Sequence, residues 1–248
     1  MQTDMTVGKP MKMLLNFTIP VFLGNVFQQL YSMADAVIVG KFVGTKGLAA
    51  VGATGTITFL IIGFLMGVTT GVTVLTSQKF GAGRMDEMRK TVGNAAILSA
   101  VIAVVMTAVS MLGMHRLLVF MHTPEDIFDG AYGYIMIICA GIFTQVLYNL
   151  VSSILRALGN SKTPLYFLIL AAGLNIVLDL VFIIFFHWGA PGAAWATVIS
   201  QGVSGVLCLI YMWKAVPELK MKKEDWYFNR DIAVKQISVG IPMGLQYS

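Results

Sequence analysis

Charged residues are scarce in this sequence, and they rarely interrupt its apolar stretches. Only 12% of the 248 residues are charged, against about 25% in a typical soluble domain. Hydrophobic residues make up 57% of the chain, and the mean hydropathy is +0.79. The 17 Lys and Arg exceed the 12 Asp and Glu by 5, but they are dispersed in short polar segments. The composition indicates a membrane protein and argues against a nucleic-acid-binding surface.

Cysteine and histidine are too few to suggest a structural framework or a resident metal. The two cysteines, Cys139 and Cys208, each lie inside an apolar run. Two isolated thiols form neither a disulfide scaffold nor a Cys-x-x-Cys metal site. The three histidines lack the spacing of metal ligands. We therefore expect no bound cofactor.

Long apolar runs dominate the sequence. A membrane-spanning helix needs about 20 apolar residues, and six runs reach that length. Alternation of apolar and polar residues is absent, so all six are predicted to be helices. This pattern predicts an all-α integral membrane protein. The predicted spans are 14–39, 51–78, 92–114, 127–155, 164–187 and 191–213.

The positive charges predict how these spans are oriented. With the N-terminus inside, fourteen Lys and Arg fall on the inner side, and only Lys41, Lys46 and Arg116 fall on the outer side. Because cytoplasmic loops carry the excess of Lys and Arg, we predict a cytoplasmic-membrane protein with its N-terminus inside. The first run could instead be a cleaved signal, since Ala34-Asp35-Ala36 resembles a cleavage site. That run is too long for a signal, and cleavage would leave five spans against a charge pattern that fits six.

The last part of the sequence resembles the first. After a polar connection at 214–235, residues 236–248 turn apolar again. Aligning Pro242 with Pro20 also matches Ile241 with Ile19 and Leu245 with Leu23. We interpret 1–213 as a six-helix N-terminal lobe and 236–248 as the start of a seventh span, so that the chain is the front part of a doubled, twelve-helix protein.

Two acidic residues, Asp35 and Asp179, lie well inside the predicted spans, and the other ten lie in connections or at span ends. At about 1.5 Å per residue, Asp35 lies about 34 Å along its helix from Lys12, and Asp179 lies about 26 Å from Lys162. Both acids are thus predicted in the outer half of the membrane, with no Lys or Arg at that depth. Burying such a carboxylate in a membrane costs several kcal/mol of free energy unless it is paired, hydrated, protonated or bound to a cation.

Other polar side chains are predicted at the same level. Asn175 is one helical turn before Asp179, Gln28 is two turns before Asp35, and Thr197 falls at a similar depth on the sixth span. Carboxylate, amide and hydroxyl oxygens suit a hard monovalent cation, and the acids could also accept a proton. The alternative is a polar cluster that only holds helices together.

Two further patterns have structural or chance explanations. Gly63, Gly67 and Gly71 recur on one helix face, which indicates close helix packing. The segment Gly202-Val-Ser-Gly205 matches a short pattern of intramembrane serine proteases, but Ser204 has no histidine near it along its span. We therefore predict that the protein is not an enzyme.

Five separated motifs stand out in the sequence: Asn16–Pro20, Tyr31–Lys41, Gly47–Gly52, Gln78–Gly83 and Leu155–Pro164. Together they resemble the MATE (multidrug and toxic compound extrusion) family. The resemblance implies two six-helix lobes around a central cavity and no enzymatic activity. It also implies cation-coupled export of small organic, often cationic, compounds or drugs, with membrane lipids and a C-terminal lobe of the same protein as partners.

The resemblance also implies roles for individual residues. The cation site of the DinF-like branch, which uses Na⁺ or H⁺, matches Asp35, Asn175, Asp179 and Thr197, which would be the ligands of a bound Na⁺. Polar residues near that site and its cavity match Gln28, Tyr134 and Asn149.

Two other functions remain as alternatives. A flippase of lipids or lipid-linked precursors in the same superfamily would need basic residues in its cavity, and the spans offer acids but no deep Lys or Arg. A membrane scaffold without transport would leave the two buried acids unexplained.

Overall fold

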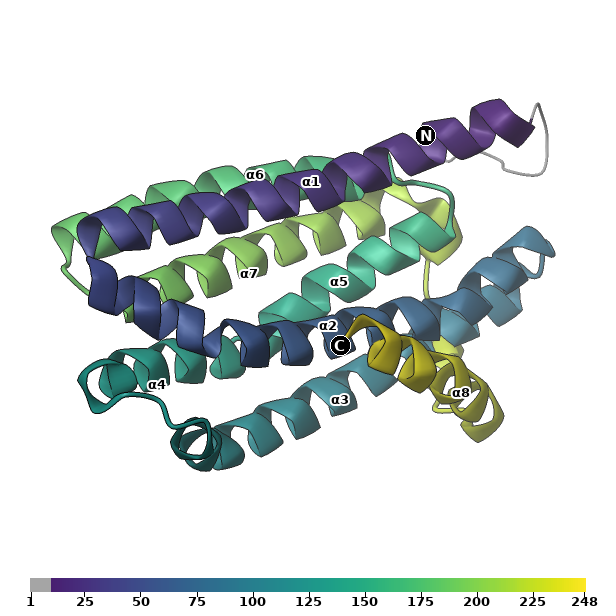
Figure 1. Cartoon of the computed structure of the whole chain (residues 1–248). Coiled ribbons are helices and arrows are strands. Elements are labelled where there is room, and N and C mark those ends of the chain that lie inside the picture. The colour runs from purple at the N-terminus through teal and green to yellow at the C-terminus, as the bar shows by residue number, and fades with distance from the viewer. Residues whose placement is uncertain (1–9) are drawn as a thin grey trace.

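The computed structural model describes residues 10–248, which form a bundle of helices and contain no strand (Figure 1). Lys9, which the topology prediction counts on the inner side, lies outside the described residues. The all-α prediction is confirmed for the part that is described. The helices are α1 (Pro10–Phe42), α2 (Thr45–Gly81), α3 (Met85–Phe120), α4 (Glu125–Ala140), α5 (Ile142–Ala157), α6 (Lys162–Leu180), α7 (Gly189–Ala215) and α8 (Arg230–Tyr247).

Within residues 10–248, five helices are long and apolar enough to cross a membrane, and a sixth span results if α4 and α5 are counted together. Those two helices meet at 46°, a bend that the sequence did not predict because the run 127–155 contains no proline. The bend lies at Gly141, where a Cβ atom would overlap the Val198 side chain of α7. Close contact with α7 at this glycine accompanies the break in the span.

The helices are arranged so that α1 and α6 lie side by side, with α7 and α5 next to them and α2 and α3 beyond (Figure 1). Two clusters of buried apolar side chains fill the bundle. One gathers around Leu118, Ile135 and Ile142, and the other around Met88 and Leu155. Much of α1 is left uncovered by the described residues, and its Phe22 is 63% exposed.

The connection that follows α7 is shorter and more ordered than the sequence suggests. It contains two short 3₁₀ turns, Pro217–Leu219 and Lys223–Trp226, and α8 begins at Arg230 rather than at Gln236. The earlier start is explained by Asn229, whose side-chain oxygen accepts hydrogen bonds from the backbone N–H groups of Asp231 and Ile232 at 2.9 and 3.1 Å.

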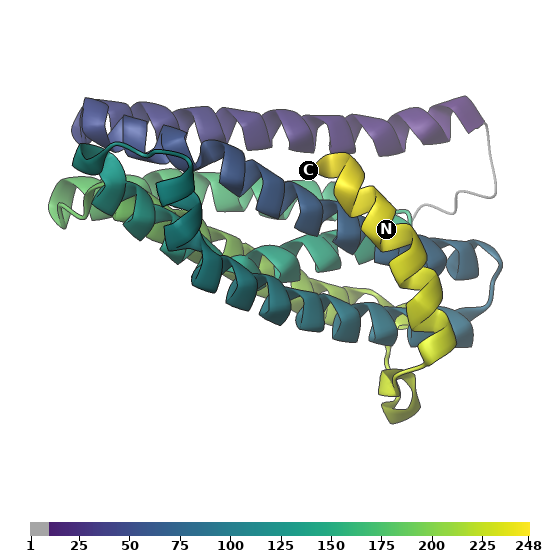
Figure 2. The ribbon, with the colours of Figure 1, turned by 60° about the horizontal axis from the view of Figure 1, so that its bottom comes forward.

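Helix α8 crosses α2 obliquely and at close range (Figure 2). Gly63, Gly67 and Gly71 of α2 face the backbone of α8, and a Cβ atom on any of them would overlap it. The prediction that these glycines serve close helix packing is confirmed, and their partner is the last helix of the chain.

Candidate functional site

Asp35 of α1 and Asp179 of α6 come together where these two helices run side by side. The two carboxyl groups lie next to each other, and the residues are 8% and 0% exposed. Asp179 is in the last turn of α6, just before a π-helical turn at Val181–Phe185. Such turns often occur at functional sites.

The pair is chemically incomplete. Neither carboxylate makes an ion pair with any residue in 10–248. One oxygen of Asp35 and both oxygens of Asp179 are buried and receive no hydrogen bond from the described residues. Two carboxylates are both acceptors, so they cannot satisfy each other without a proton or a cation between them.

Neutral oxygen atoms lie beside this pair. Asn175 lies one turn before Asp179 on α6, and its amide donates to the Thr197 hydroxyl of α7 at 3.4 Å. The other end of the amide, Asn175 Oδ1, is buried and has no hydrogen-bond donor among the described residues. The structure thus joins the four residues matched to the cation site through three helices, and their oxygen atoms are of the kind that hard cations bind.

The remaining expected residues are divided between two places. Tyr134 of α4 is buried and lies within electrostatic range of Asp35 and Asp179. Gln28 and Asn149 instead line a cavity that meets α1 between Pro20 and Gln28, on the N-terminal side of Asp35. Of the three predicted neighbours, only Tyr134 is placed beside the acids.

Two polar residues of this region were missed in the sequence. Tyr31 of α1 lies near both carboxylates and against the side chain of Gln201 of α7, whose amide oxygen is buried without a donor among the described residues. Tyr31 is one turn before Asp35, and Gln201 is one turn after Thr197. The same four-residue spacing that linked Asn175 to Asp179 would have revealed both.

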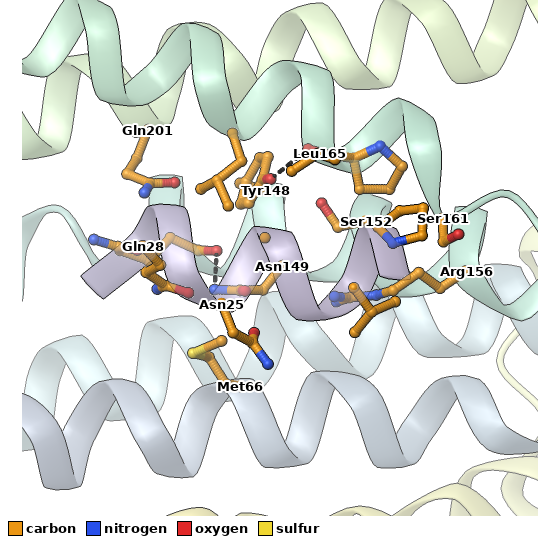
Figure 3. Close-up of a pocket in the computed structure, with 16 residues that line it drawn as sticks. Asn25, Gln28, Met66, Tyr148, Asn149, Ser152, Arg156, Ser161, Leu165 and Gln201 are labelled. Atoms are coloured by element: carbon orange, nitrogen blue, oxygen red, sulfur yellow. Dashed lines mark hydrogen bonds between the residues drawn. The ribbon is translucent and has the colours of Figure 1, made fainter. Parts of the chain in front are cut away.

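The cavity beside Gln28 is narrow and polar. It lies between α1, α5, α6 and α7, and α5 contributes a row of polar side chains to it (Figure 3). Gln201 belongs to its lining, so the cavity extends toward the acid pair. A wider cavity of about 910 Å³ adjoins it between α1, α2, the end of α5 and α8. The α5 residues in the narrow cavity are Gln145, Tyr148, Asn149, Ser152 and Arg156.

Comparison with known proteins identifies the family. The family model MatE matches residues 20–181. The chain belongs to the MatE family. The probable multidrug resistance protein YpnP of Bacillus subtilis is 33% identical to this member over 98% of the chain and 54% of its own length. The probable multidrug resistance protein NorM of Thermotoga maritima is 27% identical over 95% of the chain and 51% of its own length.

Solved structures agree with this assignment. An outward-facing multidrug resistance MATE family transporter of the MOP superfamily superposes with a TM-score of 0.90 at 28% identity, and the match covers 97% of this MatE chain and 53% of the other. The chain thus spans about half the length of the relatives that it matches.

Family membership decides several of the sequence-based predictions. This MatE chain is a multi-pass membrane protein, and its family consists of transporters rather than enzymes. The lipid flippase alternative is not favoured, because the relatives are multidrug resistance proteins. The assignment to the DinF-like branch stays a prediction.

Proposed function

We propose that this chain forms the N-terminal lobe of a cation-coupled antiporter that exports small organic compounds, often cationic drugs, by alternating access. The coupling ion is Na⁺ or H⁺, and a C-terminal lobe completes the transport path. The observation that carries the proposal is the buried pair Asp35 and Asp179, which has no cationic partner among the described residues and three oxygen atoms without a donor.

The acid pair suits coupling because its energy depends strongly on whether a cation is present. Two carboxylates close together in a poorly polarisable interior repel each other, and each loses hydration. A Na⁺ among Asp35, Asp179, Asn175 and Thr197, or a proton on the pair, removes this repulsion and favours tight packing of α1 against α6. Release of the cation leaves negative charge that loosens this contact and attracts a cationic substrate.

The proposed setting is the cytoplasmic membrane with the N-terminus inside. The 3₁₀ turns after α7 and the loop between α2 and α3 then lie on the cytoplasmic side, as the distribution of Lys and Arg favours. Proton or Na⁺ entry from outside would drive the substrate outward.

Efflux measurements on paired variants test the coupling role. In energised everted vesicles that contain this chain together with its C-terminal lobe, Asp35→Asn and Asp179→Asn should each abolish cation-driven accumulation of ethidium, because asparagine keeps the shape but removes the charge. Separate Na⁺ and pH gradients distinguish the two coupling ions. The matched control is Asp129→Asn, which changes an exposed acid outside the site and should transport normally.

A different outcome would contradict the coupling role of the acid pair. If both Asp→Asn variants at the site retain efflux with unchanged cation dependence at equal protein levels, coupling does not reside in this lobe.

A further inference from the structure

Arg156 is placed unusually for a basic residue at the end of a membrane-spanning helix. It lies in the last turn of α5, is only partly exposed, and belongs to the lining of both the narrow and the wide cavity. Figure 3 shows its side chain extending into the narrow cavity on the side of Asn25, which lines both cavities as well. The guanidinium group therefore lies where the two cavities meet.

This guanidinium has unused hydrogen-bonding capacity. Arg156 donates to the Ser153 hydroxyl at 3.2 Å, and it makes no ion pair with any residue in 10–248. An arginine carries five N–H donors in a planar fork, which matches a carboxylate or a phosphate. Most of the N–H donors of Arg156 are therefore available to a ligand in the cavity.

A second donor near Arg156 also lacks a partner. Ser152 lies one turn before Arg156 on α5 and lines the narrow cavity. The residue is 1% exposed, and its hydroxyl is buried with no hydrogen-bond partner among the described residues. Ser161, which is also buried, contributes another hydroxyl to this lining. The inner end of the cavity thus combines one positive charge with several neutral donors.

Membrane topology alone does not explain this orientation. A basic residue at an inner helix end follows the positive-inside rule and interacts favourably with the helix dipole. Both effects need only a charge near the membrane surface. Lys162, at the start of α6, supplies such a charge, because its side chain is exposed and lines neither cavity. The side chain of Arg156 is turned inward instead.

The wide cavity next to Arg156 has room for an organic molecule. Its volume of about 910 Å³ is near the upper end of the roughly 300–1,000 Å³ found for small-molecule sites. Apolar side chains such as Phe17, Phe80 and Met85 form part of its lining, and Glu218 is the acidic residue in it.

Building on the proposed export function, we propose that Arg156 and the hydroxyls around it bind an acidic group, a carboxylate or a phosphate, of the transported compound. The apolar part of the compound lies in the wide cavity. The substrates of this lobe then include anionic or amphoteric molecules in addition to cations, and the acid pair farther along α1 serves the coupling ion.

Binding can be measured without transport. Phenyl phosphate and benzoate are titrated calorimetrically into the purified chain in a non-ionic detergent, and phenyltrimethylammonium serves as the cationic counterpart. Arg156→Gln should weaken phenyl phosphate binding at least about tenfold, because a charge-assisted, bidentate contact is lost. Ser152→Ala should weaken it a few-fold. Comparing benzoate with phenyl phosphate shows which acidic group is preferred.

Matched variants keep the result interpretable. Lys162→Gln removes the same charge from the same end of the molecule but outside the cavities, and should leave binding within about twofold. Arg156→Lys keeps the charge without the fork and should bind with intermediate affinity, which covers the case in which Arg156→Gln does not fold. Equal phenyl phosphate affinity in the parent and the Arg156 variants, or an equal loss in Lys162→Gln, would overturn the proposal. Because no transport is measured, failure here leaves the coupling role of the acid pair intact.

Discussion

At the scale of single residues, the two acids of the site differ from the buried hydroxyls that bond to their own helix. Buried hydroxyls such as that of Thr54 donate to a carbonyl of their own helix, here Val51 O at 2.9 Å, and require nothing further. A buried carboxylate accepts only, so Asp35 and Asp179 depend on a proton or a cation from outside the helices. This difference is the reason for proposing them as the coupling site.

If Na⁺ is the coupling ion, Thr197, the proposed neutral ligand, should contribute less to its binding than the acids do. A Na⁺ titration of thermal unfolding, with choline as the reference ion, should show that Thr197→Ala raises the half-saturating Na⁺ concentration by roughly threefold to tenfold, as expected when one neutral interaction of about 1 kcal/mol is lost. Asp179→Asn should remove the Na⁺ effect entirely. Thr54→Ala deletes a buried hydroxyl that bonds to a carbonyl of its own helix, and it should behave like the parent. A Thr197→Ala midpoint equal to that of Thr54→Ala would show that the hydroxyl is not a ligand.

The sequence predicted these residues better than it predicted their surroundings. Asp35, Asn175 and Asp179 were recognisable because charged and amide side chains stand out in apolar helices and repeat at helical spacing. The position of Arg156 was not recognisable. A sequence places it at an inner helix end, but whether its side chain turns toward water or into a cavity depends on how α5 packs against α1 and α6, which composition does not determine.

At the scale of elements, α8 and the segment before it are attached to α2 and α3. The buried Gln236 of α8 donates to the backbone carbonyls of Val72 and Thr91 at 3.0 and 2.8 Å. Asn94 of α3 accepts a hydrogen bond from the Asn229 N–H at 2.9 Å, and Arg89 pairs with Asp225 at 3.6 Å. These hydrogen bonds and this ion pair join α8 and the segment before it to both α2 and α3. We therefore expect α8 to move together with these two helices during transport.

The glycines of α2 should be essential for this attachment. Gly67→Ala places a Cβ atom in the backbone of α8 near Met243 and Gly244, and it should lower the stability by about 1–3 kcal/mol, the range for overpacked contacts. Gly55→Ala is the control in the same helix, because nothing lies within 4 Å of its added Cβ. Thermal unfolding in detergent measures the difference. Equal unfolding temperatures for the two variants would contradict the close crossing of α2 and α8.

Some features of the helices could be predicted from the sequence, and others could not. Helix content and the glycine stripe follow from local patterns, and they were predicted. The partner of the stripe comes from a segment far along the chain, and the bend at Gly141 arises against Val198 of α7. Both depend on contacts between distant segments, for which a single sequence provides no periodic signal.

At the scale of the whole molecule, the polar segments gather at two opposite ends of the bundle. Helix α3 has 36 residues, so its ends are about 54 Å apart at 1.5 Å per residue. The turn Lys223–Trp226 lies against the beginning of α3, through the pair of Arg89 and Asp225. Glu125 follows the other end of α3 closely in the chain. The two segments therefore lie on opposite sides of any membrane that α3 crosses.

The orientation of the molecule can then be decided with two single cysteines. After Cys139 and Cys208 are replaced by alanine, Glu125→Cys and Glu224→Cys each introduce a thiol at an exposed position. On intact cells, a membrane-impermeant maleimide should label Glu125→Cys, and it should reach Glu224→Cys only after permeabilisation, because the excess of Lys and Arg assigns the Glu224 side to the cytoplasm. Labelling of both variants in permeabilised cells controls for reactivity. The reverse pattern would place the N-terminus outside, and it would also require the coupling cation to reach Asp35 and Asp179 from the other side of the membrane.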